Sequence, residues 1–392
     1  MKALVVGAGI AGLVTARQLG LAGWQVELLE RSAGPRLDGY MMDFFGPGVD
    51  ASVRIGLYPR LKATAYRVEA AQYVDAEGRV SASLDYDRFA RLAGGKVLSL
   101  LRPDMEKAAL AALEDVPAGR IRVRYGVGVS GATADDGAVR VSFDGAEAAE
   151  SAGDVLIGAD GIHSSVRSHV FGPEEQYLRP LGMRAAAFIV ADPELNGRFR
   201  NRFTLSDTID RTAALYSLRS DEVAALMVYR DNGPLTSGET RRDRLRREFA
   251  GLGDAVDRLL KLCPEDPYDD VVAQIVMPRW HTGGAVLVGD ACGAVSLLAG
   301  QGGSLAIAGA ALLGDLLGPA NSRAEAEDAL AEFERRWRPT VETAQTSGRR
   351  AASTFLPANR AQRLLRRWVI RATRLPGVDR LVARQILRTI AT

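Results

Sequence analysis

The chain has 392 residues, a length that predicts two domains and excludes a fold with one small core. Hydrophobic residues make up 47% and charged residues 25%, which excludes a mostly disordered or fibrous chain. The 50 Lys and Arg residues nearly balance the 48 Asp and Glu residues, and the net charge of +2 provides no overall basic field for binding nucleic acid.

The first thirty residues predict the start of a parallel α/β domain. Residues 2–6 form a short apolar run, 7–12 form a glycine turn, 13–22 carry apolar residues at helical spacing, and 24–30 predict a second buried strand. This order of strand, helix and strand is typical of parallel sheets. Residues 31–59 are rich in Gly and Pro and predict an ordered, irregular segment, which at this length is usually functional.

The next segments predict a helix, a hairpin and a strand. A helix is expected over 103–114, because Pro103 suits its first turn. Two alternating segments, 120–129 and 138–143, predict a hairpin. Another buried strand is expected over 154–159.

A change of pattern between residues 181 and 229 predicts a second domain. Segments such as 211–218 and 222–229 are β-rich with outward polar positions, which favours a mixed or antiparallel sheet. Buried strands return over 271–277 and 285–288. The first domain is therefore expected to be assembled from separate parts of the chain.

Two later segments have a helical pattern. Residues 241–262 predict a charged helix, and the tail from 349 to 388 holds eleven arginines and one acid, Asp379, among apolar residues. The simpler interpretation of this tail is an amphipathic helical cap whose arginine stems cover apolar surface. The alternative is contact with an anionic membrane surface or a partner.

The glycine turn carries the first functional pattern. Its three glycines match GxGxxG, in which the first two permit a close backbone approach to a pyrophosphate and the third permits close helix packing. An acid ends the next strand, where it would accept hydrogen bonds from adenosine ribose hydroxyls. We therefore predict dinucleotide binding by Gly7, Gly9, Ile10, Ala11, Gly12, Glu30 and Arg31.

A second stretch, 126–131, also matches GxGxxG. A hairpin-like turn follows it instead of a helix, so we interpret this match as coincidental. A nicotinamide cofactor would therefore lack a Rossmann domain of its own.

Two further motifs resemble those of a known family. Residues 155–167, VLIGADGIHSSVR, resemble the GADG-x-x-S-x-VR motif of class A flavoprotein monooxygenases of the aromatic-hydroxylase type. The sequence Gly289-Asp290-Ala291 completes the three-motif order of that family. The resemblance covers about residues 1–317, and the motif pattern is most similar to that of the tetracycline-inactivating monooxygenases.

The resemblance implies an α/β fold with a discontinuous, Rossmann-like FAD-binding domain, a substrate domain on a mixed β-sheet and a C-terminal helical segment. We place the FAD-binding domain at 1–62, 89–172 and 272–318, the substrate domain at 63–88 and 173–271, and the helical segment at 319–392.

Roles for single residues also follow from the resemblance. Asp290 would bind the ribityl or pyrophosphate region of FAD, and the backbone of three glycines would approach the flavin ring. The stretch RLDGYMMD resembles a family pattern whose arginine, here Arg36, is linked to NADPH and whose aspartate, here Asp43, is linked to FAD. The other residues implied to bind FAD are Arg102, Asp160, Gly161, Gly300, Gly302 and Gly303. For Asp160 a purely turn-forming role is the alternative.

Three residues depart from the family pattern. Gly293, Leu297 and Ser304 stand where the family has His, Pro and Asn. The family's Pro lines the space beside the reactive flavin carbon, so Leu297 leaves other flavin chemistry open. The alternatives are a flavin-dependent reductase or oxidase acting on a hydrophobic substrate, and a non-catalytic binding protein that retains the fold.

The resemblance implies a monooxygenase in which NADPH or NADH reduces FAD, O₂ adds to form a C4a-hydroperoxide, and this species hydroxylates an aromatic or polyketide-like molecule. The chemistry is assigned to the flavin, and no side chain is assigned a catalytic role. The residues that we predict to line the substrate pocket are Tyr40, Phe45, Phe188, Phe203, Tyr216 and Met227.

Histidine and cysteine spacing predicts no metal site, since the three histidines lack HExxH spacing and a cysteine partner. Cys263 and Cys292 cannot supply a disulfide framework.

The apolar start of the chain is expected to be a strand and not a signal peptide. The apolar stretch 285–317 is interrupted by Asp290, so it is not expected to span a membrane. We therefore expect a cytoplasmic protein.

Overall fold

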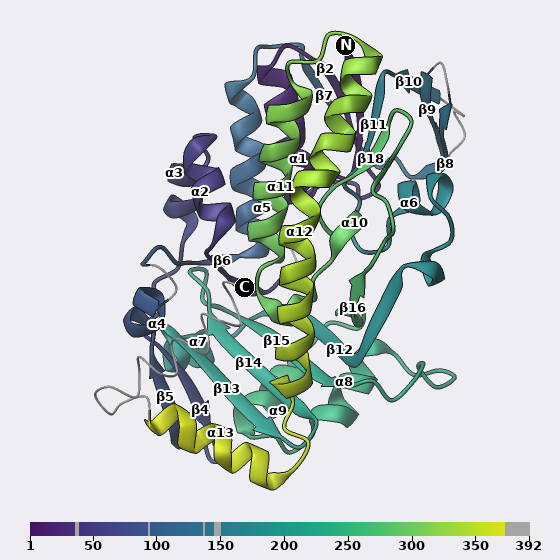
Figure 1. Cartoon of the computed structure of the whole chain (residues 1–392). Coiled ribbons are helices and arrows are strands. Elements are labelled where there is room, and N and C mark those ends of the chain that lie inside the picture. The colour runs from purple at the N-terminus through teal and green to yellow at the C-terminus, as the bar shows by residue number, and fades with distance from the viewer. Residues whose placement is uncertain (36–38, 93–94, 136–137, 145–149, 373–392) are drawn as a thin grey trace.

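Two large sheets organise the chain, one of six strands and one of seven (Figure 1). The computed structural model describes residues 1–35, 39–92, 95–135, 138–144 and 150–372. The six-stranded sheet is parallel except at one edge, the seven-stranded sheet is mixed, and helices follow near the C-terminus. The predicted α/β fold class is therefore confirmed.

The six-stranded sheet has the order β17-β18-β11-β1-β2-β7. Its strands are β1 (Lys2–Val6), β2 (Gln25–Glu30), β7 (Ile121–Tyr125), β11 (Val155–Gly158), β17 (His281–Thr282) and β18 (Ala285–Leu287). The helices beside it run side by side (Figure 1) and are α1 (Ile10–Leu21), α5 (Arg102–Ala111), α11 (Gly302–Leu317) and α12 (Arg323–Phe355). One continuous core joins this sheet to these helices, because their apolar faces pack on the buried strands.

The predicted hairpin is corrected by the structure. Residues 120–129 do not form one hairpin arm, because β7 pairs in parallel with β2. The antiparallel unit consists of β8 (Val129–Asp135), β9 (Ala138–Phe143) and β10 (Glu150–Gly153). The second GxGxxG match spans the junction of β7 and β8 and is followed by a strand, which confirms that it is coincidental.

The segment 31–59 is less irregular than predicted. It holds β3 (Met41–Phe44), α2 (Pro47–Arg54) and the start of α3 (Tyr58–Thr64). β3 pairs with β6 (Leu98–Leu101), which leads directly into α5. The glycine and proline residues of this segment therefore separate short elements.

The seven-stranded sheet has the order β16-β12-β15-β14-β13-β4-β5 and is mixed because β13 and β4 are parallel. Its strands are β4 (Ala70–Val74), β5 (Val80–Asp85), β12 (Leu178–Ala191), β13 (Arg202–Thr208), β14 (Arg211–Ser217), β15 (Glu222–Arg230) and β16 (Tyr268–Ile275). The predicted domain division remains a proposal that rests on the two sheets, with β16 extending the second sheet to Ile275.

Helices cover one face of this sheet (Figure 1). They are α7 (Pro193–Phe199), α8 (Arg241–Phe249) and α9 (Asp254–Leu262), and the short α4 (Tyr86–Leu92) follows β5. The single helix predicted over 241–262 is thus two helices. The break contains Gly251 and Gly253, which both have positive φ angles that a continuing helix does not allow.

The tail forms α13 (Arg360–Ala372), and its predicted extension to residue 388 lies outside the described residues. Its arginines face the sheet, where Arg363 and Arg367 pair with the buried Asp207 at 3.3 and 2.5 Å. This agrees with a helical cap, but the cap leaves apolar side chains exposed on its outer side, namely Leu364, Leu365 and Trp368. Within the described ranges, the helices are either too short or too polar to cross a membrane.

Candidate functional site

The first glycine turn joins β1 to α1, and it has no room for a side chain at Gly7 or Gly12. Gly7 has a φ of +101°, and a Cβ on Gly12 would lie 1.8 Å from the carbonyl oxygen of Gly7. The Gly7 N–H donates to the carbonyl of Leu29 at 2.7 Å, which holds the turn against β2. The first amides of α1 are therefore available to an anion at this end of the sheet.

Glu30 lies beside the turn, as the sequence predicts for the acid at the end of the second strand. Its carboxylate accepts hydrogen bonds from the backbone N–H groups of Ala8 at 2.8 Å and Ser32 at 3.0 Å. The side chain is almost fully buried, whereas the neighbouring Arg31 is exposed. The turn and the acid thus form one unit.

A pocket extends from this turn to the seven-stranded sheet. One wall comes from β16, and another from the start of α10 (Asp290–Gly293) and the segment between α10 and α11. Ten of the predicted cofactor or substrate residues line it: Gly9, Ile10, Ala11, Tyr40, Arg102, Gly161, Asp290, Gly300, Gly302 and Gly303. These residues come from six separate parts of the chain, so the fold is what brings them together.

The glycines of this pocket leave its surface flat. A Cβ on Gly161, Gly300 or Gly302 would meet no protein atom within 4 Å, so a side chain there would enter the pocket. The N-terminus of α11 lies at the same wall. Ser296, which also lines the pocket, has a φ of +96°, and such strain is concentrated at functional sites.

A cationic and an acidic side chain, Arg102 and Asp290, both line the pocket. Arg102 lies 2.9 Å from Glu106, and its backbone N–H donates to the carbonyl of Tyr40 at 3.0 Å. Burial raises the pKa of Asp290 above its ordinary value, and the charge of Arg102 partly offsets this effect. Burial also raises the pKa of Tyr40 to about 12, so its hydroxyl stays protonated.

The GADG loop is held by its own side chains. Asp160 accepts hydrogen bonds from the hydroxyls of Ser164 and Ser165 and from the Val166 N–H. These contacts favour the loop-forming role for Asp160, while Gly161 lines the pocket. Arg167 is fully buried and donates to the carbonyls of Ala291 and Ile162, so it links this loop to α10.

Other predicted residues lie away from the pocket lining, among them Asp43 and Phe45, and Arg36 lies outside the described residues. Asp43 faces Tyr86 and Ser99, whose hydroxyls bind its carboxylate, with 3.0 Å to Ser99. Burial raises the pKa of Asp43 to about 7. Phe45 is buried after β3.

The departures from the family pattern have a structural basis. A Cβ on Gly293 would lie 2.6 Å from Val341 of α12, so α12 occupies the space of a side chain. The Ser304 hydroxyl donates to the Phe45 carbonyl at 2.5 Å and accepts from the Gly48 N–H at 2.9 Å. Leu297 lines the pocket and packs against a small apolar cluster that includes Met183 of β12 and Val272 of β16.

A second, aromatic pocket of about 460 Å³ lies beside β3. Met41, Phe203 and Tyr216 line it, and the rings of Phe203 and Tyr216 meet edge to face at 4.8 Å. Phe188 and Met227 instead lie on the opposite face of the sheet, in the core beneath α8 and α9. Their predicted place in a substrate pocket is therefore corrected, because alternate residues of a strand face opposite sides.

The wall formed by β16 contains residues that the sequence did not predict for the site. Tyr268 and Asp270 line the cofactor pocket. Asp270 is bound to His163 at 3.0 Å, and the other ring nitrogen of His163 lies 2.9 Å from Glu174. Because β16 is far from the glycine motifs in sequence, no spacing rule could have placed it there.

The residues present fit a dinucleotide with a flat ring. Free helix amides at the starts of α1 and α11, the carboxylate of Glu30 and the open surface of Gly161, Gly300 and Gly302 form one continuous cradle. The amides suit a pyrophosphate, and the acid suits ribose hydroxyls.

Comparison with known proteins agrees with this geometry. Residues 1–347 match the family model described as "FAD binding domain". "Uncharacterized protein Rv1260" of Mycobacterium tuberculosis is 35% identical over 324 residues, which cover 80% of this chain and 84% of that protein. A "Flavin-dependent monooxygenase" from an unknown prokaryotic organism is 29% identical over 367 residues, which cover 91% of this chain and 90% of that protein.

Solved structures share the fold over nearly the whole chain. Tetracycline destructase Tet(55) is 27% identical with a TM-score of 0.78, covering 97% of this chain and 96% of that one. Klebsiella pneumoniae HpxO complexed with FAD and uric acid is 20% identical with a TM-score of 0.78, covering 100% and 97%, and shows the fold alone. This chain therefore belongs to the FAD binding domain family, as a class A FAD-dependent monooxygenase with FAD as its cofactor.

Proposed function

We propose that the protein uses NADPH or NADH and O₂ to hydroxylate a small aromatic or polyketide-like molecule. The observation that carries the proposal is the position of β3 between the two pockets. Tyr40 and Met42 line the cofactor pocket, whereas Met41, between them in the chain, lines the aromatic pocket. A flat substrate in the aromatic pocket would thus be one strand away from the cofactor.

The chain's own residues would bind, orient and enclose the reactants. Backbone amides of α1 would hold the pyrophosphate of FAD, and the carboxylate of Glu30 would hold its adenosine ribose. Asp290 and Arg102 would contact FAD further along the pocket. Phe203 and Tyr216 offer aromatic faces for stacking a planar ring. FAD, when bound, supplies the electron transfer and oxygen chemistry that these side chains lack.

The direct test is isotopic. The FAD-loaded protein would be incubated with ¹⁸O₂, NADPH or NADH, and a panel of hydroxylated aromatic acids, anthraquinones and tetracycline, and the products would be analysed by mass spectrometry. One labelled oxygen atom in the product is the expected result. A product oxidised without the label would favour the oxidase or reductase alternative.

A variant provides the matched control for this assay. Asp290→Ala should lower FAD retention without changing the aromatic pocket, because Asp290 lines only the cofactor pocket. Labelled product should therefore fall in proportion to bound FAD. Product formation by FAD-free protein would contradict the assignment.

A further inference from the structure

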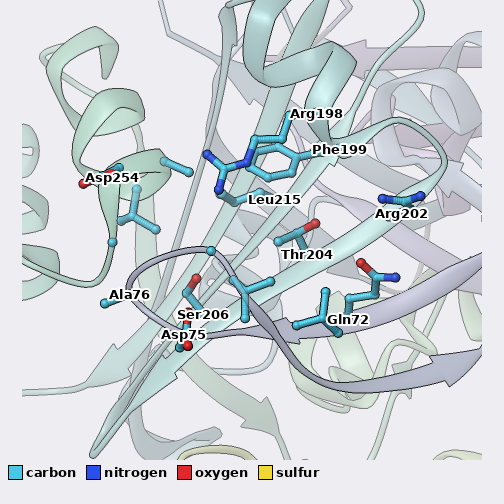
Figure 2. A pocket seen from close by; sticks show the side chains of 16 residues that line it. Gln72, Asp75, Ala76, Arg198, Phe199, Arg202, Thr204, Ser206, Leu215 and Asp254 are labelled. Atoms are coloured by element: carbon cyan, nitrogen blue, oxygen red, sulfur yellow. The ribbon is translucent and has the colours of Figure 1, made fainter.

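A third pocket lies on the face of the seven-stranded sheet opposite the aromatic pocket (Figure 2). Its floor is formed by β4 and β13, and its walls by the β4–β5 turn, the end of α7 and the start of α9. Thr204 and Ser206 of β13 face this pocket, whereas Phe203 and Leu205 face the other side. The cavity volume of about 230 Å³ is below the range of drug-sized ligand sites, so it suits a small molecule.

Two hydroxyl groups on the floor lack a hydrogen-bond partner within the described part of the chain. The side chains of Thr204 and Ser206 line the cavity (Figure 2), although the two residues are only 5% and 6% exposed. Their oxygens are open to the cavity and not enclosed by protein, so a bound molecule can reach them. The floor therefore favours an occupant that forms hydrogen bonds to both.

Two guanidinium groups border the same cavity (Figure 2). Arg198 lies over the Phe199 ring at 5.7 Å, and a Cβ on Gly78 would come within 2.1 Å of its Nη2. The side chain thus reaches from α7 to the β4–β5 turn, and the turn has glycine where the guanidinium lies. Among the described residues, neither Arg198 nor Arg202 has a carboxylate partner.

The acids of the pocket do not neutralise these cations. Asp75 is already bound by Arg79, whose backbone N–H and Nε both donate to it at 2.8 Å. The remaining acid, Asp254, lies at the exposed first turn of α9. Two guanidinium groups therefore face one available carboxylate, and the local charge favours an anion.

We propose that this pocket binds a small hydroxylated oxyanion. Arg198 and Arg202 would hold its phosphate or carboxylate group, because guanidinium groups form strong charge-assisted hydrogen bonds with oxyanions. Thr204 and Ser206 would bind its hydroxyl groups. The site lies on the other face of the sheet from the aromatic pocket, with Arg202 bordering both, and it does not depend on the proposed reaction.

Calorimetric titration of the FAD-loaded full chain at constant ionic strength tests the proposal. The probes are glycerol 3-phosphate and glycerate, which distinguish a phosphate from a carboxylate, and glycerol, which has hydroxyl groups but no charge. Saturable binding of one of the two anions, with none of glycerol, is expected. Absence of saturable binding of both anions up to about 10 mM would overturn the proposal.

Variants locate the binding. Arg198→Gln and the double variant Thr204→Val/Ser206→Ala should each weaken binding about tenfold, whereas Asp254→Asn should strengthen it a few-fold. Arg200→Gln is the matched control, since it removes the same charge two positions from Arg198 at a residue outside this pocket. It should leave affinity within about twofold.

Two results would overturn the assignment to this pocket. One is a full effect in Arg200→Gln, which would indicate non-specific charge attraction. The other is unchanged affinity in both Arg198→Gln and the double variant. Melting curves without ligand would verify that every variant is folded.

Discussion

The walls of the cofactor pocket and those of the aromatic pocket consist of different parts of the chain. Backbone and glycine surface form much of the cofactor pocket, as at Gly161, Gly300 and Gly302, whereas side chains on strands form the aromatic pocket, as at Phe203 and Tyr216. A backbone wall keeps its shape as long as its glycines are kept, while a side-chain wall changes its chemistry with any substitution of the residues that form it. This difference explains how one fold can keep a cofactor and accommodate different substrates.

Two polar clusters lie close to the boundary between these regions. On one side, His163 of the GADG loop binds Asp270 of β16. On the other, Asp43 of β3 binds the hydroxyl of Tyr86, which follows β5. Substitutions in the pocket walls and substitutions in these two clusters therefore test the difference between the cofactor pocket and the aromatic pocket independently.

The largest expected effect is a loss of stability that differs between the two faces of the seven-stranded sheet. Phe188→Ala should lower the free energy of unfolding by about 3–5 kcal/mol, because it leaves a cavity in a closed core. Phe203→Ala should lower it by only about 1–2 kcal/mol, because this ring is partly exposed in a pocket. Urea denaturation of both variants measures the difference.

The same pair should behave in the opposite way toward substrate. Phe203→Ala should raise KM for the substrate found in the labelled-oxygen screen, and Phe188→Ala, where still folded, should leave KM unchanged. Equal stability losses combined with equal KM values would refute the assignment of the two faces.

The next effect tests the backbone walls. Gly12→Ala should destabilise the FAD-free protein by about 3 kcal/mol, because the new Cβ meets the Gly7 carbonyl. Gly302→Ala should leave the FAD-free protein as stable as the wild type, since its Cβ points into open space at the start of α11. Thermal melting of both variants without FAD measures this contrast.

FAD titration completes that test. Both variants should bind FAD more weakly, Gly12→Ala through the distorted turn and Gly302→Ala through its methyl group in the pocket. Unchanged FAD affinity in Gly302→Ala would mean that the flavin does not lie against α11.

The contrast between backbone turns and side chains on strands explains which residues could be predicted from the sequence. Gly7, Gly12 and Glu30 were predictable because a tight turn and its acid are determined by local spacing. Phe188 and Phe203 could not be distinguished, because strand alternation shows which residues share a face but not which face the helices cover. That depends on α8 and α9, and the β16 wall depends on pairing with β12, which are both long-range features.

A smaller effect is expected at Asp43. Burial raises the pKa of Asp43 to about 7, so the folded protein favours the protonated form of this side chain. Its contribution to stability is full below about pH 4 and is lost as the pH rises through 7. Asp43→Asn should remove this loss, so the melting temperature of the variant should fall less between pH 4 and pH 8 than that of the wild type. A variant with the pH profile of the wild type would contradict burial as the cause.

The smallest effect concerns His163, which is half-exposed. Hydrogen bonds with Asp270 and Glu174 raise its pKa to about 9. Its stabilising contribution is therefore complete below about pH 6.5 and is lost as the pH rises through 9. His163→Gln should flatten this decline in melting temperature, with an effect of less than about 1 kcal/mol because the pair is partly solvated.

His169→Gln is the control for this last prediction, because His169 is an exposed histidine in the same helical turn region and has no hydrogen bond to Asp270. It should keep the wild-type decline. Since Asp270 lines the cofactor pocket, His163→Gln should also weaken FAD binding at pH 7, and this loss should disappear at pH 10, where the wild-type histidine is neutral. A loss of FAD affinity that is equal at both pH values would mean that the shape of His163, and not its charge, supports the β16 wall.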